Sequence, residues 1–400
     1  MGTKSSYTND ILAGSGNLFI FRNANCETRI DTTHDKAGNE IKTLRIRNTQ
    51  NVQTFNYKAV EGLYHTTGSG NNLLAELFSL PLDRVEPLNS YFEKYGFFIP
   101  ISSESFETFS YHDLYSIIAR IHALLNLIQE LQKKTPDCNR LFRQTTRLQF
   151  TNPITISNEA GYTYKTCTHF LIAKIESVNL NDLHTPPQYM VEEEYGMPYA
   201  HVPDSMSPTG FTDISIDEFM DEYEPSRLSP YLRNLLASCF DCDHAHRRMI
   251  ELYCHIENSS IMTLKGNNFD ILTKLQFSDQ TDLNQETKYP DLKDRIIEAA
   301  KTTIKDELEY ALRNIKPSYD SDTTLGAWNI PDFLSALYFS IFYMRPDLQI
   351  FRLCASPYCN NYFTVTSTNS RKKYCCHECA NYVSQRAYRS RKQQSNNKPE

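Results

Sequence analysis

The chain has 400 residues, of which 40% are hydrophobic and 22% are charged. This is an ordinary globular composition, so disorder of the whole chain is excluded, and the length suits about two or three domains. Thirteen glycines are too few for a collagen-like architecture. No 18-residue apolar run occurs, so we expect no membrane span. Residues 1–16 are polar, which argues against a secretory signal, and we expect a cytoplasmic protein with reduced cysteines.

The net charge of −7 is unevenly distributed. Residues 352–400 carry nine Lys or Arg and two Glu, a net of +7, whereas residues 1–351 carry −14. A basic tail on an acidic body predicts that the tail meets an anionic partner. By charge, the body itself does not resemble a nucleic-acid binder.

The first elements are predicted from alternation and from helical spacing. Residues 17–60 alternate in short apolar runs around a polar turn at 35–39, which is typical of paired strands. A helix is expected over 73–80. A longer helix is expected over 110–133, where apolar residues recur at spacings of three and four. Residues 154–176 are rich in Thr, Tyr and branched residues, which predicts strands and a hairpin at Gly161.

The segment 184–227 is predicted to be an acidic, proline-rich linker or loop. Its part 191–224 has ten acidic residues and no Lys or Arg. An exposed acidic loop is the simpler interpretation. Self-docking of this stretch with the basic tail is the alternative.

After Pro225 the pattern predicts helices over 230–257, 292–315 and 331–344, the last of them apolar on nearly all sides. A single helix over 235–255 would place Cys239, Cys242 and His246 on one face. These three residues could form a second metal site, although buried core residues are the favoured interpretation.

Five of the eleven cysteines lie close together near the C-terminus. Cys354 and Cys359 are followed, after fifteen intervening residues, by Cys375, Cys376 and Cys379. Four thiolates can surround one Zn²⁺ tetrahedrally. A module of under about 50 residues has little core of its own, so we expect one structural Zn²⁺ to supply its folding energy.

The predicted ligands are Cys354, Cys359, Cys375 and Cys379. Strands at 362–365 and 372–374 would return the second group of cysteines to the first, and a helix would run over about 377–392. Cys375 and Cys379 would lie one helical turn apart. Cys376 in place of Cys375 would form a C-x2-C pair, and His377 could replace a thiol, so these alternatives stay open.

A resemblance supports this interpretation. The segment RLCASPYCNNYF, followed by RKKYCCHECANYVSQRAYRSRK, resembles the CGNR-type zinc finger of bacterial proteins described as transcription regulators. Cys376 stands where that family usually has Ser, and Ala380–Tyr382 replaces Gly-Asn-Arg. The resemblance covers about 45 residues and implies a small treble-clef-like zinc module. It also implies DNA binding.

The predicted C-terminal helix is basic. Tyr382, Arg386 and Arg389 share a face, and Arg391 and Lys392 extend the positive end. A second basic group precedes the metal site: Arg371, Lys372 and Lys373. These side chains suit DNA phosphates. A protein-docking surface and a solvated helix end remain the alternatives.

The sequence therefore predicts an α+β protein with four segments. These are an α+β region (1–183), the acidic linker (184–227), a helical region (228–350) and the zinc module (351–395). We expect a cytoplasmic DNA-binding or regulatory protein whose body senses a ligand or partner. The alternatives are a protein–protein adaptor with a purely structural zinc, or an uncharacterised enzyme. No common catalytic motif occurs, so we expect no catalytic site.

Overall fold

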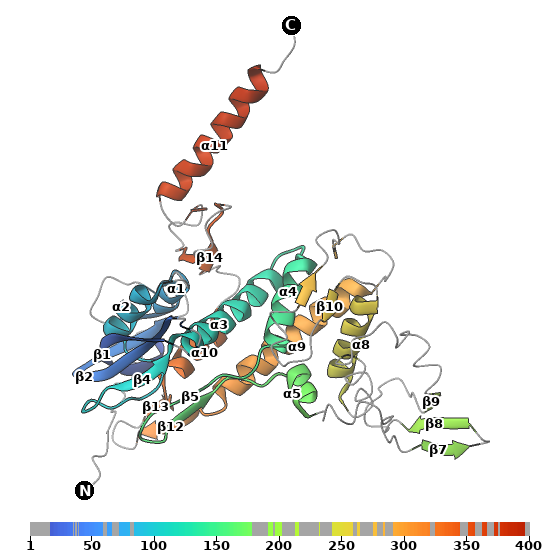
Figure 1. The fold of residues 1–400 in the computed structure, drawn as a ribbon, viewed down its shortest axis with the longest axis horizontal. Coiled ribbons are helices and arrows are strands. Elements are labelled where there is room, and N and C mark those ends of the chain that lie inside the picture. Colours follow the sequence, from blue (N-terminus) through green and yellow to red (C-terminus); the bar gives the residue numbers. More distant parts are fainter. Residues whose placement is uncertain are drawn as a thin grey trace. The chain divides into compact units, whose positions relative to one another are not determined.

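A computed structural model describes residues 17–34, 36, 38, 40–58, 62–65, 72–80, 84–177, 191–194, 197–201, 213–215, 232, 242–258, 262–264, 275–277, 283–284, 291–320, 325–344, 351–356, 362–365, 372–374 and 377–396. Helices and strands are mixed along the chain, which confirms the predicted α+β class. The chain divides into two units (Figure 1). Unit 1 comprises 1–122, 154–165 and 311–400, and unit 2 comprises 123–153 and 166–310.

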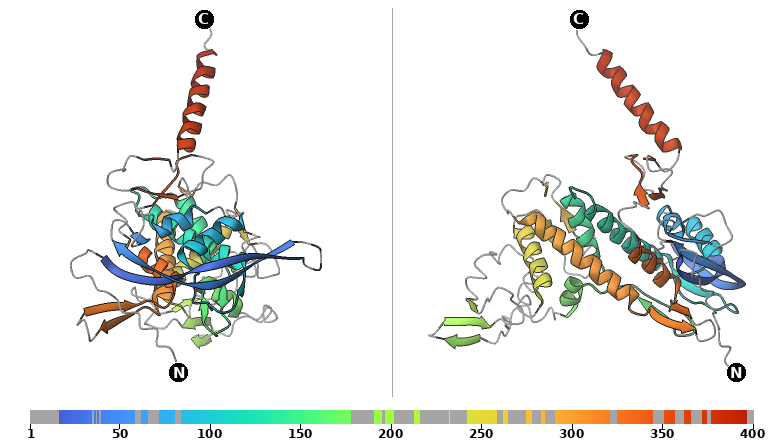
Figure 2. Two further views of the ribbon diagram at one scale, coloured as in Figure 1. Left: turned by 90° about the vertical axis from the view of Figure 1, so that its left-hand side faces the viewer. Right: turned by 180° about the vertical axis from the view of Figure 1, so that it is seen from behind.

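A long antiparallel hairpin is the main element of unit 1. Strands β1 (Asn17–His34) and β2 (Glu40–Lys58) pair along nearly their whole length, as the alternation predicted (Figure 2, left). A bulge interrupts the pairing between Ala24 and Cys26. Strands β3 (Gly62–His65) and β4 (Glu107–Ser110) pair with β2 at different points, so β1 forms an edge of this sheet.

The inner face of the hairpin is aromatic. Phe19, Phe21 and Phe55 are buried, and helix α10 (Phe333–Phe342) packs against this face. The rings of Phe21 and Phe333 are stacked with their centroids 5.8 Å apart. Residues 333–341 are all buried, which explains why this segment is apolar on nearly every side.

The remaining elements of unit 1 are helices and short hairpins. Helix α3 (Tyr111–Leu131) begins here and is close to the predicted span. The others are α1 (Leu73–Phe78), α2 (Val85–Tyr95), β5 (Thr155–Ser157), β6 (Thr163–Lys165), β12 (Lys316–Asp320), β13 (Leu325–Asn329), β14 (Phe351–Leu353), β15 (Tyr362–Thr364) and α11 (His377–Asn396).

Gly96 ends α2 at a position that requires glycine. Its φ is 90°, in the region that side chains avoid, and its N–H bonds the Phe92 carbonyl. A Cβ built there would lie 2.3 Å from Asn23 Nδ2 and 2.4 Å from the Ala24 carbonyl oxygen. The close approach of β1 to the end of α2 is therefore possible because Gly96 has no side chain.

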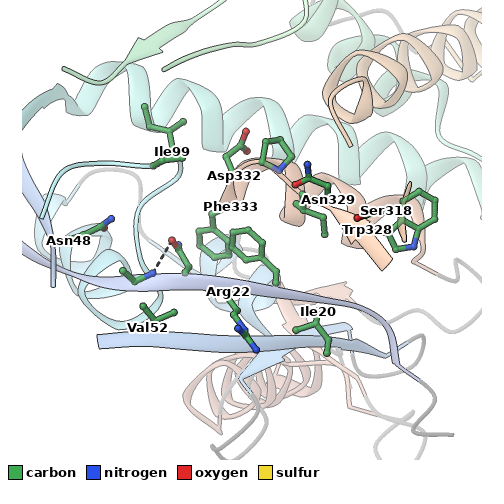
Figure 3. A pocket seen from close by; sticks show the side chains of 16 residues that line it. Ile20, Arg22, Asn48, Val52, Ile99, Ser318, Trp328, Asn329, Asp332 and Phe333 are labelled. Carbon is green, nitrogen blue, oxygen red and sulfur yellow. Dashed lines mark hydrogen bonds between the residues drawn. The ribbon is translucent and has the colours of Figure 1, made fainter. Parts of the chain in front are cut away.

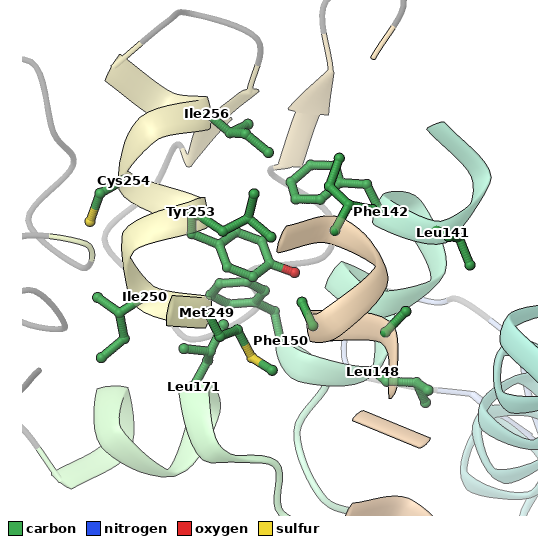
Figure 4. Close-up of a cluster of buried hydrophobic side chains, with 14 of the residues drawn as sticks. Leu141, Phe142, Leu148, Phe150, Leu171, Met249, Ile250, Tyr253, Cys254 and Ile256 are labelled. Atoms are coloured by element: carbon green, nitrogen blue, oxygen red, sulfur yellow. The ribbon is translucent and has the colours of Figure 1, made fainter. Parts of the chain in front are cut away.

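Unit 2 has a helical core. Its helices are the second part of α3, α4 (Cys138–Gln149), α5 (Phe170–Ser177), α8 (His244–Asn258) and α9 (Leu292–Leu312). Tyr253 lies at the centre beside Phe142 and Phe150 (Figure 4). The Tyr253 hydroxyl is 2.9 Å from Thr146 Oγ1, so its polar end is satisfied inside the core.

The strands of unit 2 are short. They include β10 (Met262–Leu264) and β11 (Leu275–Phe277), which pair with each other. Within the acidic segment, β7 (Val191–Glu194), β8 (Met197–His201) and β9 (Asp213–Ser215) form a three-stranded antiparallel sheet. The structure thus finds strands where the sequence predicted an irregular loop or linker.

Two local predictions were wrong. Residues 170–175 belong to helix α5 rather than to a strand, because Leu171 and Ile172 are buried in the unit 2 core and tertiary packing overrides β propensity. The expected continuous helix over 235–255 is interrupted at Cys242 and Asp243, which are not helical, and α8 begins at His244. Asp243 caps the start of α8, since its Oδ1 accepts the His246 N–H at 3.0 Å.

Among the described helices, none is long and apolar enough to cross a membrane.

Candidate metal centre in the C-terminal module

The C-terminal module begins with a two-stranded hairpin. Strands β14 and β15 are antiparallel, with Arg352 opposite Phe363. The predicted strand at 372–374 was wrong: β15 pairs with β14 instead, and residues 372–374 belong to no strand. That segment still follows the hairpin closely: the Ala355 N–H bonds the Lys373 carbonyl at 2.9 Å, and Arg352 Nη1 bonds the Lys372 carbonyl at 2.8 Å.

Two of the predicted zinc ligands belong to one small cluster. Cys354 directly follows β14 and is buried together with Phe363 and Val365. Cys379 is the third residue of α11, and with Tyr374 it packs against this group while remaining half-buried. Residues 25 positions apart therefore meet at the start of the helix.

The other predicted ligands, Cys359 and Cys375, lie outside the described residues, as do Cys376 and Arg371. The choice between Cys375 and Cys376 therefore stays open. His377 opens α11 and is exposed, with Nδ1 3.1 Å from the Asn381 amide nitrogen. The arrangement suits a metal in its donor set, because thiolates at the end of a strand and in the first turn of a helix are typical ligands of structural zinc.

The basic residues gather around the same helix. Arg386 is exposed on α11, and Tyr382 one turn before it is 47% exposed. Lys372 and Lys373 are exposed just before the helix, and the Lys372 ammonium lies 5.3 Å from the Phe363 ring centroid. The remaining predicted basic residues are in α11, although their side chains lie outside the described part: Arg389, Arg391 and Lys392.

Comparison with known proteins agrees with this geometry. Residues 351–392 match the CGNR zinc finger family. This match confirms the resemblance drawn from the cysteine spacing and identifies the C-terminal segment as a zinc-binding module. No curated protein matches the chain. No solved structure matches it either.

The second metal site considered for Cys239, Cys242 and His246 rested on one continuous helix, which the structure does not contain. Cys242 precedes α8 and is buried in the core of unit 2, and Cys239 lies outside the described residues. Both ring nitrogens of His246 face carboxylates: Nδ1 is 2.7 Å from Asp243 Oδ2, and Nε2 is 3.4 Å from Asp306 Oδ2. Burial lowers the pKa of His246, but the Asp306 and Asp243 carboxylates outweigh it and raise that pKa.

Unit 2 contains a buried polar cluster that the sequence analysis did not predict. Cys167, His169 and Glu307 are all buried, and their potential ligand atoms lie within 4.8 Å of one another. His169 Nε2 is 2.7 Å from Glu307 Oε2. Glu307 is 138 residues from His169, and no spacing rule connects the two.

The hydrogen bonds around His169 argue against metal binding. The Gln149 Oε1 atom accepts the Leu171 N–H at 3.3 Å, so the Gln149 amide nitrogen faces His169 Nδ1 at 3.5 Å. Because the Gln149 amide nitrogen donates towards Nδ1, Nδ1 must carry a lone pair. The proton of the ring is then on Nε2, which donates to Glu307. A metal on Nε2 would need the opposite tautomer, with two donors facing each other. The cluster is therefore a structural hydrogen-bond network.

Proposed function

We propose that residues 351–395 form a treble-clef-like module that holds one structural Zn²⁺ through Cys354, Cys359, Cys375 and Cys379. The match to the CGNR zinc finger family supports this proposal. So does the cluster of Cys354 and Cys379, whose buried core is too small to fold a module without further stabilisation. The metal would fix the start of α11 against the hairpin.

We further propose that α11 binds DNA within a cytoplasmic regulatory protein. The observation that carries this proposal is a 20-residue helix that follows the cysteine cluster and bears four Lys or Arg against one Glu. Arg386, Lys372 and Lys373 are exposed, so phosphates can reach these side chains. Because residues 1–351 carry a net charge of −14, the tail must supply the attraction. The proposal assigns no catalytic role to the body.

The test is binding of the full-length, zinc-loaded chain to mixed duplex DNA at several salt concentrations. Four to six phosphate contacts predict a slope of roughly −4 to −5 in log K against log salt. The double variant Arg386→Gln/Arg389→Gln should reduce the size of that slope by about 2 while keeping the zinc.

The matched control removes two positive charges from the body. Lys42→Gln/Lys94→Gln should leave the slope unchanged, because these exposed lysines pair with Glu40 and Glu76 in unit 1. An equal loss of slope in both double variants would mean that net charge, rather than α11, controls binding.

A protein–protein adaptor is the second candidate. Tyr382 and Arg386 are exposed one turn apart on α11, and Tyr and Arg are the side chains that most often dominate protein interfaces. No DNA binding at low salt would favour this function. If the acidic segment docks on the tail, Glu192→Gln/Glu193→Gln/Glu194→Gln in β7 should strengthen DNA binding.

A further inference from the structure

The first half of helix α11 has a packed side and an open side. Cys379, Ala380 and Val383 are half-buried, and they share one side of the helix because an α-helix has about 3.6 residues per turn. Cys379 packs against the buried cluster of the C-terminal module, so this is the side that the module covers. The opposite side is the surface of the helix that a partner can reach.

The open side carries two amide side chains in consecutive turns. Asn381 and Gln385 are four residues apart, so they lie on the same face of α11, and both are exposed. His377, one turn before Asn381, is exposed on this face too. The face therefore offers hydrogen-bonding groups, which can distinguish one base from another, rather than positive charge alone.

The Asn381 amide is held by a bond within the helix. An amide nitrogen can only donate, so Asn381 Nδ2 donates to His377 Nδ1, at 3.1 Å. This bond uses one N–H and leaves the second N–H and the Oδ1 atom to offer one donor beside one acceptor. Adenine presents the matching pair in the major groove of duplex DNA, with its N7 acceptor beside its N6 donor, whereas guanine presents two acceptors there.

The spacing of the two amides fits the rise of DNA. Four residues of α-helix span about 6 Å, at about 1.5 Å per residue. Successive bases of one strand are about 3.4 Å apart along the DNA axis. A helix that lies along the major groove therefore places Asn381 and Gln385 about two base pairs apart.

We infer that α11 reads sequence in the major groove, where Asn381 and Gln385 each recognise an adenine and the two adenines are about two base pairs apart. This inference rests on the proposed DNA binding and adds a base preference to it. The exposed basic residues contact phosphates, which carry no sequence information, and the amides contact base edges. Glu378, the acid in the first turn, already has an interaction partner within the chain.

The test starts with selection from a pool of duplexes that have a randomised central segment. Full-length, zinc-loaded protein is the bait, and the bound duplexes are sequenced. We expect enrichment of two adenines about two positions apart on one strand. Replacement of either adenine in a selected duplex should weaken binding about tenfold, because a bidentate amide contact discriminates between bases by this order.

Variants separate base reading from phosphate binding. Asn381→Ala should lose the preference at one adenine position and Gln385→Ala at the other, while the slope of log K against log salt stays that of the parent. Arg386→Gln should do the reverse, with a slope smaller by about 1 and the same selected sequence. Asn51→Ala removes an exposed amide from β2 and is the matched control, which should change neither quantity. The zinc content of each variant shows that the module is intact.

Three results would overturn the base reading and leave the proposed DNA binding in place. The first is binding of duplexes without any enriched sequence. The second is an enriched sequence that lacks adenines at this spacing. The third is the same preference in the parent and in both amide variants. If no duplex binds even at low salt, the proposed DNA binding is wrong and the base reading is wrong with it.

Discussion

Removal of one zinc ligand is the most direct test of the C-terminal module. In the described part of the module, Phe363 and Val365 are the buried apolar side chains beside Cys354. Their burial contributes roughly 1.5–3 kcal/mol each. Structural zinc contributes about 10–16 kcal/mol to small zinc modules. Cys354→Ser should therefore release the metal and unfold the hairpin and the start of α11, while unit 2 stays folded.

The assay combines zinc content with limited trypsin digestion. Carefully reduced parent protein should contain one Zn²⁺ per chain and resist cleavage near Arg386. Cys354→Ser and Cys359→Ser should contain none and be cleaved rapidly there. Cys26→Ser is the control, because Cys26 is buried in β1 at 5% exposure and its loss should leave the zinc in place.

Two results would refute the reasoning: parent protein without zinc, or zinc retained at full occupancy by both ligand variants. Two zinc ions per chain would instead contradict the hydrogen-bond interpretation of Cys167, His169 and Glu307. The same assay decides the open ligand. Zinc retained by Cys376→Ser and lost by Cys375→Ser supports Cys375, and the reverse supports the C-x2-C pair.

Three further predictions concern stability. Gly96→Ala should lower the free energy of unfolding by about 3 kcal/mol, because it combines backbone strain with a Cβ contact at 2.3 Å. Gly161→Ala, with a similar φ of 86° but open space, should cost only about 1–2 kcal/mol in the same urea titration. Glu307→Ala should lower the free energy of unfolding by about 2–3 kcal/mol, because it leaves the buried His169 N–H without an acceptor. Glu307→Gln keeps an acceptor oxygen and should lower it clearly less. Equal losses in the two variants would refute the tautomer assigned to His169. The raised pKa of His246 stabilises the fold fully below its ordinary value of 6.5, and this stabilisation is lost as pH rises through the folded pKa. The melting-temperature gap between parent and His246→Gln should therefore be wider at pH 5.5 than at pH 9, and a constant gap would count against the two carboxylate contacts.

The local spacing of apolar residues predicted those helices and strands whose buried face follows the same spacing. The hairpin of β1 and β2 alternates because one face is buried, and α3 has a stripe because one side meets the core. The same spacing gave a wrong prediction where tertiary packing or a helix cap determines the type or the start of an element. Residues 170–175 carry strand-forming side chains but bury Leu171 and Ile172 in a helical core. Asp243 starts a helix in the middle of an apparently continuous periodic run.

The same distinction between local spacing and long-range packing applies to the candidate sites. Cysteine spacing predicted the zinc-finger match because the five clustered cysteines lie within 26 residues, where loop closure restricts the geometry. Unit 1 also contains a pocket of about 330 Å³ beside β1 (Figure 3). This pocket could not be predicted, because the residues of β1, β2 and β13 that line it come together only in the tertiary fold. The His169–Glu307 pair is likewise a product of long-range packing.

The place of α10 in the chain has a consequence for synthesis on the ribosome. The aromatic face of the hairpin, with Phe19, Phe21 and Phe55, is complete once residue 58 has been made, but the helix that covers it begins at Phe333. At about 5–20 residues per second, the nascent hairpin waits roughly 15–55 s for this cover. During that interval it exposes an apolar surface next to the strand edge of β1, which is the kind of surface that chaperones bind. Fragments that end before α10 should therefore aggregate even when they contain the whole four-stranded sheet.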